Sequence, residues 1–233
     1  MQITELFYSI DGEGIRTGLP VIFIRSFGCN MLCSYCDSHY AVLPSCTKTE
    51  IREMSACEIL DAIKQWPCKR VTLTGGEPLL QGDCYTLIKM LLEEQYEVNV
   101  ETNGSINPYQ VNPFNKELMS YPYLYSDKLF FTFDYKCPSS GQEKKMNTAI
   151  LTDMEKRDVL KFVVGSTEDL HRAEQIIAEY HPSGQIFISP VFGKIEPKEI
   201  VEFIKSSEVL RNNNARMQLQ LHKFIWPVDM TGV

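Results

Sequence analysis

The chain has 233 residues, 44% of them apolar, which is enough to bury a large core and fits one domain over residues 1–233 better than two small ones. Its formal net charge of −7 argues against nucleic acid or an anionic membrane as a partner. No basic leader or bilayer-length apolar stretch is evident, so we expect a cytoplasmic protein.

Apolar runs with the length of buried strands recur along the chain. They lie at 21–25, 70–74, 97–101, 129–135, 159–164, 185–189 and 217–221. Helical patterns separate several of them: Ser55 and Glu58 form a capping box before a helix that extends to about residue 65, and Asp83 is expected to cap the next. Further helices are predicted to begin at Thr167 and Pro197, and segment 107–127 is predicted to be an irregular connection.

The alternation of strands and helices predicts a mainly parallel sheet in an α/β fold. Seven strands and about five helices are too few for a complete eightfold barrel. We therefore predict an open, partial TIM-like barrel with fewer helices than a full one, and with its chemistry at the C-terminal ends of the strands.

Three of the eight cysteines, Cys29, Cys33 and Cys36, lie on a loop just after the predicted strand 21–25. Iron–sulfur cubanes usually take four cysteine ligands, so a set of three suggests that one iron keeps a position open for an exogenous ligand. The same spacing leaves two other interpretations, namely unrelated thiols or a zinc ion held with His39 or Cys46.

Polar segments follow three other predicted strands, at 74–78, 101–104 and 134–136. Each is also typical of a simpler feature: Gly-Gly, Glu-Pro and Asn-Gly pairs mark ordinary turns, and Asp134 with Lys136 fits a surface ion pair. Because parallel strands end at the same edge of a sheet, we expect these segments to border the cysteine loop.

The cysteine loop resembles the CxxxCxxC signature of the radical S-adenosylmethionine (SAM) superfamily, and residues 75–78 resemble its GGEP motif. The resemblance implies that the three cysteines hold a 4Fe-4S cluster, and that SAM chelates the open iron and is cleaved to a 5'-deoxyadenosyl radical. The cofactor then carries the difficult chemistry. The SAM contacts implied are Tyr35, Asp37, Gly75, Gly76, Glu77, Glu101, Asn103, Asp134, Tyr135 and Lys136.

Six ordered segments, 7–14, 29–38, 74–81, 101–104, 134–141 and 218–223, are similar to those of the 7-carboxy-7-deazaguanine synthase family of queuosine and 7-deazapurine biosynthesis. This resemblance implies a carbon–nitrogen lyase that converts 6-carboxy-5,6,7,8-tetrahydropterin to 7-carboxy-7-deazaguanine, with ring contraction and loss of ammonia. It also implies an electron donor such as flavodoxin or ferredoxin, and a homodimer.

The same resemblance implies a substrate site. Arg25 offers a guanidinium fork for the substrate carboxylate, although a rim salt bridge is the simpler interpretation. Ser38 supplies a hydroxyl for Mg²⁺. The remaining predicted substrate contacts are Ile10, Asp11, Gly12, Glu13, Thr74 and His222, the last at the end of the final predicted strand.

Three features depart from the family pattern. Asp11 stands where glutamine is expected, and Ser38 stands where threonine is common. The chain also continues beyond His222 and Lys223, so a substrate contact made by a terminal carboxylate in some members is not transferred to it.

Two other functions remain open from the sequence. A glycyl-radical activase would use the same cluster and SAM on a protein substrate, but it leaves Arg25, Ser38 and His222 without a role. A non-catalytic iron–sulfur or zinc module does not need the glycine and acidic segments at the strand ends.

Overall fold

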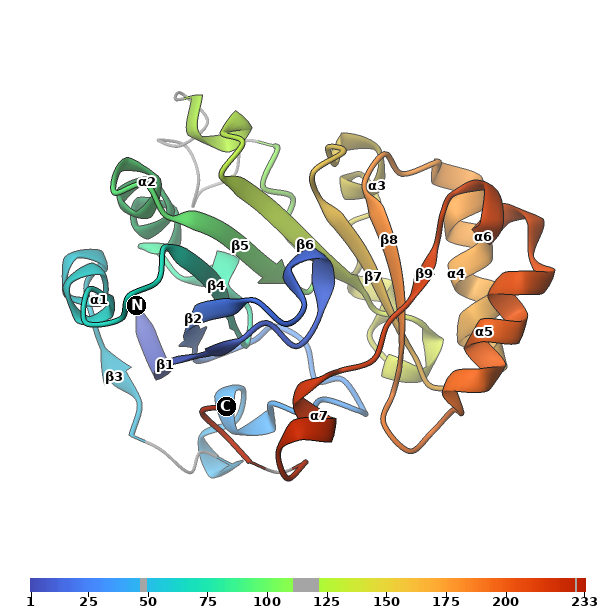
Figure 1. Ribbon diagram of the computed structural model, residues 1–233, viewed down its shortest axis with the longest axis horizontal. Helices are drawn as coiled ribbons and strands as arrows, with labels where there is room; N and C mark the ends of the chain where they lie inside the picture. The colour runs from blue at the N-terminus through green and yellow to red at the C-terminus, as the bar shows by residue number, and fades with distance from the viewer. Residues whose placement is uncertain (47–49, 111–121, 229) are drawn as a thin grey trace.

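The computed structural model describes residues 1–46, 50–110, 122–228 and 230–233, and its centre is one curved sheet (Figure 1). Within these residues the sheet has nine strands in the order β3-β1-β2-β4-β5-β6-β7-β8-β9. Strands β2 and β4 to β9 are parallel, whereas β1 is antiparallel to β2 and β3. The strands are β1 (Gln2–Ile10), β2 (Pro20–Ser26), β3 (Arg52–Glu53), β4 (Arg70–Gly75), β5 (Glu97–Thr102), β6 (Leu129–Tyr135), β7 (Val159–Val164), β8 (Gln185–Pro190) and β9 (Arg216–Met217).

The longer helices pack outside the curve of the sheet, with α1 and α2 toward one end and α4, α5 and α6 toward the other (Figure 1). The helices are α1 (Ala56–Ile63), α2 (Cys84–Glu93), α3 (Ile150–Asp153), α4 (Thr167–Tyr180), α5 (Pro197–Ser206), α6 (Glu208–Asn212) and α7 (His222–Ile225). Strands β3 and β9 end the sheet without pairing with each other, so the barrel is open, as predicted.

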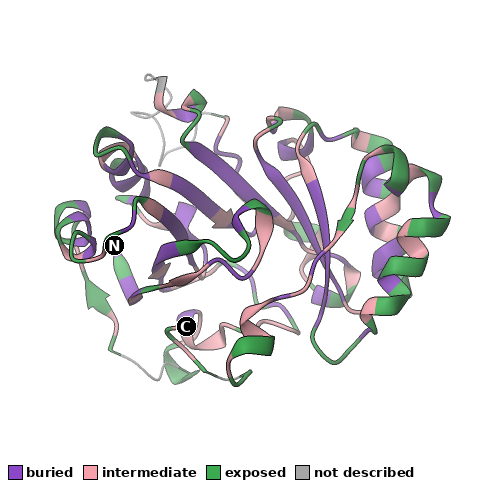
Figure 2. Ribbon diagram, viewed as in Figure 1, coloured by how far each residue is buried: buried purple, intermediate pink, exposed green. Residues whose placement is uncertain are grey.

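The parallel strands are buried almost throughout, as Figure 2 shows, because helices cover one face and the other lines a cavity. On the helix side, Ile59 and Ile63 of α1 and Leu87 and Leu91 of α2 are fully buried in one continuous apolar core. Strand β7 is buried at every position although it contains Lys161. The core therefore fixes one face of the sheet and leaves the other for polar side chains.

Most of the predicted elements are confirmed, including the first six strands and the capping box of Ser55 and Glu58. Pro197 occupies the first turn of α5, as expected. Asp83 occupies the N-cap position of α2, as expected, but its side chain makes no capping hydrogen bond. Of the irregular segment 107–127, residues 111–121 lie outside the described residues, and Pro122–Tyr125 forms a 3-10 helix.

The last predicted strand was wrong beyond Met217, because the chain leaves the sheet to contact the turn that follows β1. The Gln218 side chain accepts a 2.9 Å hydrogen bond from the Gly14 backbone N–H, and Leu221 N–H donates to the Gly12 carbonyl over 3.0 Å. His222 consequently begins helix α7 and does not end a strand.

The sequence analysis also missed β1 and β3. Strand β1 mixes exposed and half-buried polar positions with apolar ones, since it lies near the sheet edge, and β3 has only two residues. None of the helices in the described part of the chain combines the length and apolar character needed to traverse a bilayer.

Candidate active site

A cavity of about 380 Å³ opens at the C-terminal ends of the parallel strands. It is bordered by the turn after β1, the cysteine loop, the ends of β4 to β7 and the C-terminal segment. Nearly all predicted site residues line it. These are Ile10, Asp11, Gly12, Glu13, Arg25, Cys29, Cys33, Tyr35, Cys36, Asp37, Ser38, Thr74, Gly75, Gly76, Glu101, Asn103, Asp134, Lys136 and His222.

Two predicted SAM contacts, Glu77 and Tyr135, do not line the cavity. Glu77 is fully buried, and its carboxylate accepts hydrogen bonds from Thr102 Oγ1 (2.8 Å) and from the backbone N–H of Asn103 (2.7 Å) and Leu79 (3.0 Å). Glu77 thus joins the glycine segment to the end of β5. The Tyr135 hydroxyl points elsewhere, donating to Glu143 over 3.0 Å.

The two glycines before Glu77 permit a close approach of backbones. A Cβ on Gly75 would overlap the backbone of Ser26, and one on Gly76 would overlap the carbonyl of Gly28. Gly76 N–H donates to Ser26 and Glu77 N–H donates to Gly28, over 3.0 and 2.8 Å. The glycine segment is therefore held against the start of the cysteine loop.

The cysteine loop places its three thiols along the cavity. Cys29 Sγ accepts hydrogen bonds from Asn103 Nδ2 and from the Met31 backbone N–H, both at 3.4 Å, and these donors hold the side chain in place. Burial raises the pKa of Cys36 to about 11 and also raises the pKa of Cys33. Iron binding must therefore release protons from thiols that would otherwise stay neutral at pH 7.

The donor set suits a cubane better than a single ion. Among the described residues, no three His, Cys, Asp or Glu side chains converge closely enough to hold one metal ion, and Cys46 is exposed. The three cysteines therefore do not form a preassembled zinc site with His39 or Cys46 among the described residues. In a cubane each thiolate binds its own iron, which places the ligands further apart.

Arg25, at the end of β2, has a carboxylate partner on one side only. Its Nε donates to Glu5 Oε2 over 2.8 Å, and Tyr40 Oη donates to the same oxygen over 3.0 Å. The rings of Phe7 and Tyr40 lie 5.8 Å from the guanidinium carbon. The structure shows no hydrogen bond from the two terminal nitrogens to any described residue, which leaves them available to an anionic ligand.

Lys161 was missed by the sequence analysis, although a lysine inside the apolar run Val159–Val164 was a signal for it. Its Nζ lies 3.2 Å from Glu13 Oε2 and 3.7 Å from Asp134 Oδ2, and Lys136 Nζ lies 3.0 Å from the same Asp134 oxygen. Glu13 Oε1 and Asp134 Oδ1 are buried and have no partner among the described residues. Two carboxylate oxygens in the cavity wall are therefore free to accept ligand N–H groups.

Asp11 is held within the protein more firmly than expected. Arg16 Nε donates to Asp11 Oδ2 over 2.9 Å, and both side chains are 4% exposed. Burial raises the pKa of Asp11, and the Arg16 charge opposes that rise. The guanidinium also bonds Thr72 of β4, so Asp11 ties the turn after β1 to the sheet.

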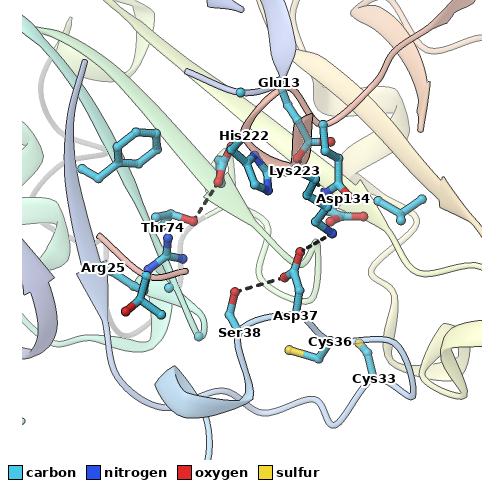
Figure 3. A pocket seen from close by; sticks show the side chains of 18 of the residues that line it. Glu13, Arg25, Cys33, Cys36, Asp37, Ser38, Thr74, Asp134, His222 and Lys223 are labelled. Carbon is cyan, nitrogen blue, oxygen red and sulfur yellow. Dashed lines mark hydrogen bonds and ion pairs between the residues drawn. The ribbon is translucent and has the colours of Figure 1, made fainter. Parts of the chain in front are cut away.

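On the opposite wall, Asp37 accepts hydrogen bonds from Ser38 Oγ (3.1 Å) and Lys223 Nζ (3.1 Å), as Figure 3 shows. His222 stacks so closely on Gly12 that a Cβ there would lie 2.5 Å from His222 Nδ1. Burial lowers the pKa of His222, so its imidazole is neutral near pH 7.

The structure adds lining residues that the sequence analysis did not select. They are Phe7, Phe23, Met31, Tyr40, Val42, Thr102, Thr132, Lys161, Val163, Val191, Phe192, Gln220, Lys223, Val228 and residues 230–233. The segment after α7 thus returns to the cavity, although sequence reasoning had set it aside. No local pattern in these last residues predicts this return.

The open α/β barrel with a three-cysteine loop at its strand ends defines a radical SAM protein. The Radical SAM superfamily model matches residues 23–119. The crystal structure of QueE from Escherichia coli has a similar fold, with a TM-score of 0.71 at 22% identity, covering 95% of this chain and 94% of that one.

More specifically, the chain belongs to the 7-carboxy-7-deazaguanine synthase family. It is 41% identical to the 7-carboxy-7-deazaguanine synthase of Clostridium acetobutylicum, over 100% of this chain and 99% of the relative. It is 40% identical to the enzyme of the same name from Methanospirillum hungatei, over 97% and 85% respectively. Radical SAM proteins use a 4Fe-4S cluster and SAM, and the cavity described above provides a donor set of the right kind for both.

Proposed function

We propose that the chain is a radical SAM carbon–nitrogen lyase that converts 6-carboxy-5,6,7,8-tetrahydropterin to 7-carboxy-7-deazaguanine with loss of ammonia, in queuosine or 7-deazapurine biosynthesis. The observation that carries the proposal is the shared cavity. It brings the three-cysteine loop, the unengaged nitrogens of Arg25 and the free oxygens of Glu13 and Asp134 to one place. A substrate with an anionic group and an N–H-rich edge complements that wall.

Cys29, Cys33 and Cys36 are the proposed cluster ligands, and the bound cluster supplies the electron that cleaves SAM. The protein's part is to orient the cofactor. Asn103 holds Cys29 by a hydrogen bond, and the Tyr35 hydroxyl is anchored to the Val163 carbonyl at 3.2 Å.

The other proposed SAM contacts follow the cavity wall, with Asp37 on the cysteine loop and Gly75 and Gly76 at the end of β4. Glu101 and Asn103 continue it at β5, and Asp134 and Lys136 at β6. Glu77 and Tyr135 lie behind this wall. Glu77 accepts a hydrogen bond from the Asn103 backbone N–H, and the Tyr135 hydroxyl donates to Glu143.

For the substrate, we assign the carboxylate to Arg25, whose guanidinium is fixed by Glu5 and by two aromatic rings. The N–H edge of the pterin is assigned to the turn Ile10 to Glu13, where Glu13 Oε1 is an unused acceptor. Asp11 acts through the turn, because Arg16 already occupies its carboxylate.

Two further substrate contacts come from opposite sides of the cavity. Neutral His222 offers one ring nitrogen as a donor and the other as an acceptor. Thr74 Oγ1 donates to Glu101 Oε2 over 2.7 Å, so the hydroxyl orients that carboxylate and can still accept a hydrogen bond itself.

Ser38 is the proposed protein ligand for Mg²⁺. Its hydroxyl lines the cavity next to Asp37, and hydroxyl and carboxylate oxygens are ligands that Mg²⁺ prefers. The lowered pKa of Asp37 supports this role: burial opposes ionisation, but Lys223, Ser38 and Arg25 together outweigh it. Asp37 is thus an anion throughout the physiological range.

The deciding experiment uses protein reconstituted anaerobically with iron and sulfide, then given SAM, Mg²⁺, a chemical reductant and 6-carboxytetrahydropterin. We expect 7-carboxy-7-deazaguanine and ammonia in equal amounts by chromatography and mass spectrometry. Hydrogen abstraction from a partner protein's glycine without pterin turnover would support an activase instead. A content of about one zinc without labile sulfide would support a binding module.

We also propose that the enzyme is a single domain, works in the cytoplasm and receives electrons from a carrier protein. Residues 1–233 form one radical SAM domain, supported by the single continuous sheet. All eight cysteines are free, which suits the reducing cytoplasm. An electron donor such as flavodoxin or ferredoxin would reduce the cluster.

A homodimer would bury apolar side chains that are otherwise exposed around α7. These are Phe192, Phe224, Ile225, Val228 and Met230. Light scattering of the purified protein at several concentrations tests this part, and a monomer at all of them would contradict it.

A further inference from the structure

The turn after β1 is held from two sides. On one side, Gln218 and Leu221 of the C-terminal segment bond its backbone. On the other side lies Arg16, whose side chain is only 4% exposed. The sequence analysis did not select Arg16, because an arginine in a glycine-rich turn is normally exposed.

The Arg16 guanidinium contacts three strands of the sheet. It donates hydrogen bonds to Thr72 Oγ1 and to the Val71 carbonyl (3.2 Å) on β4, and to the Glu97 carbonyl (3.3 Å) on β5. The Phe130 ring of β6 lies 5.2 Å from the guanidinium carbon. The Glu97 carboxylate is also 3.4 Å away, but it is 43% exposed, so solvent screens this contact.

These contacts place Arg16 beneath the cavity. Thr74 and Thr132 line the cavity, and Thr72 and Phe130 precede them by two residues on the same strands. Residues two apart on a strand point to the same face of the sheet. Arg16 therefore lies one layer of side chains below the cavity, inside the curve of the sheet.

Asp11 connects this layer to the turn. Arg16 Nε donates to Asp11 Oδ2 over 2.9 Å. The Asp11 backbone in turn closes the loop, through hydrogen bonds with Leu19 (2.9 Å) and Gly18 (2.8 Å). Asp11 lies two residues before Glu13, and both line the cavity. The bonds of Arg16 to the strands thus fix the position of Glu13 through Asp11.

We propose that Arg16 and Asp11 form a positioning pair that places residues 10–13 relative to the strand ends for substrate binding. The proposal rests on the proposed function, because these residues are assigned to the N–H edge of the pterin. A planar guanidinium can bond a carboxylate and acceptors on two strands at once, whereas a lysine ammonium is a point charge. The strand ends are held separately, by strand pairing and by the apolar core on the helix side, so SAM binding does not depend on the pair.

The test compares wild type with Arg16→Met, Arg16→Lys, Asp11→Asn and the double variant Asp11→Asn/Arg16→Met. Arg157→Met is the matched control, since the Arg157 guanidinium is also partly buried, bonds the carbonyls of Ser126 and Leu124, and does not line the cavity. Each reconstituted protein is characterised by its KM for the pterin and for SAM, and by its midpoint of urea unfolding. The Kd for 6-carboxypterin, a fluorescent oxidised analogue, is measured separately in the presence of SAM.

We expect KM for the pterin and Kd for 6-carboxypterin to rise at least about tenfold in Arg16→Met and Asp11→Asn, and at least about threefold in Arg16→Lys. KM for SAM should stay within about twofold of wild type. The double variant should be no worse than either single variant, because it removes both buried charges together. The control should lower the urea midpoint and leave the pterin affinity unchanged.

Wild-type pterin affinity in Arg16→Met and Arg16→Lys would overturn the proposal. An equal rise in KM for SAM would also overturn it, since Arg16 would then only support the strands. If Arg16→Met does not fold, Arg16→Lys decides alone, because it keeps a cation beneath the turn. Failure of the wild type to turn over the pterin would instead count against the proposed function.

Discussion

Lys161 Nζ lies 3.2 Å from Glu13 Oε2, so a buried ammonium on β7 joins the central sheet to the turn after β1. The same ammonium lies 3.7 Å from Asp134 of β6. Each carboxylate thereby has one oxygen oriented by a cation while the other stays unpartnered in the cavity wall. Lys161 is thus a positioning residue that arranges two acceptors for a ligand.

Replacing Lys161 with methionine should weaken substrate binding much more than it affects the fold of the outer helices. The change removes the ammonium that pairs with Glu13 and leaves Asp134 paired with Lys136 alone. Loss of one partner of a buried ion pair costs about 3–5 kcal/mol. We expect KM for the pterin to rise at least about tenfold. Lys161→Arg, which keeps the charge, should recover a large part of the affinity. Equal KM values for wild type and Lys161→Met would contradict this role.

Cys33→Ala should abolish the cluster, because a cubane with two protein thiolates lacks the ligands to persist. Iron, labile sulfide and visible absorbance after anaerobic reconstitution measure this. Cys57→Ala is the control, since Cys57 is exposed on α1 and does not line the cavity. A full complement of iron and sulfide in Cys33→Ala would show that the ligand set is different.

The sequence predicted the parallel part of the fold well because its strands are apolar runs separated by amphipathic helices, and such signals are local. The strand prediction failed at 217–221. The conformation there is set by hydrogen bonds to Gly12 and Gly14, about 200 residues away along the chain. Strand β1 was missed because polar residues interrupt its apolar ones, and because its antiparallel pairing with β2 is a long-range feature that no local pattern shows.

The site was predictable to the extent that motifs marked strand ends. The directions in which the side chains point, and their hydrogen-bond partners, could not be predicted from the motifs. Sequence reasoning placed Glu77 among the SAM contacts. Only the structure shows that its carboxylate lies behind the cavity wall and accepts hydrogen bonds from Thr102 and Asn103. Lys161 needed a different signal, namely a charge inside a buried strand, which demands a partner.

Gly76→Ala should destabilise the protein, because a Cβ at this position overlaps the Gly28 carbonyl and both backbones are fixed by hydrogen bonds. Overpacking of this kind typically costs about 1–3 kcal/mol. Gly82→Ala is a matched control, since a Cβ there meets nothing within 4 Å. In urea unfolding, Gly76→Ala should have a lower midpoint than Gly82→Ala. Equal midpoints would mean that the backbone around Gly76 can shift to accommodate the added Cβ at little cost.

Glu77 should make stability depend on pH. Burial raises its pKa from 4.5 to about 7, against the hydrogen bonds from Asn103, Thr102 and Leu79. The folded protein therefore retains a proton that the unfolded chain releases above pH 4.5. The contribution of the Glu77 proton to the free energy of unfolding is fully present below the pKa of Glu77 in the unfolded chain. It is lost as the pH rises through the pKa of Glu77 in the folded protein.

Glu77→Gln removes this titration while keeping the shape of the side chain. The variant should be less stable at every pH, because its amide nitrogen faces the N–H and O–H donors that the carboxylate accepted from. The difference from wild type should nevertheless shrink by roughly 3 kcal/mol between pH 4.5 and pH 7 and then stay constant. Urea unfolding of the metal-free proteins across this range measures it. A difference that widens with pH would mean that the hydrogen-bond donors outweigh burial and that Glu77 is held as an anion behind the cavity wall.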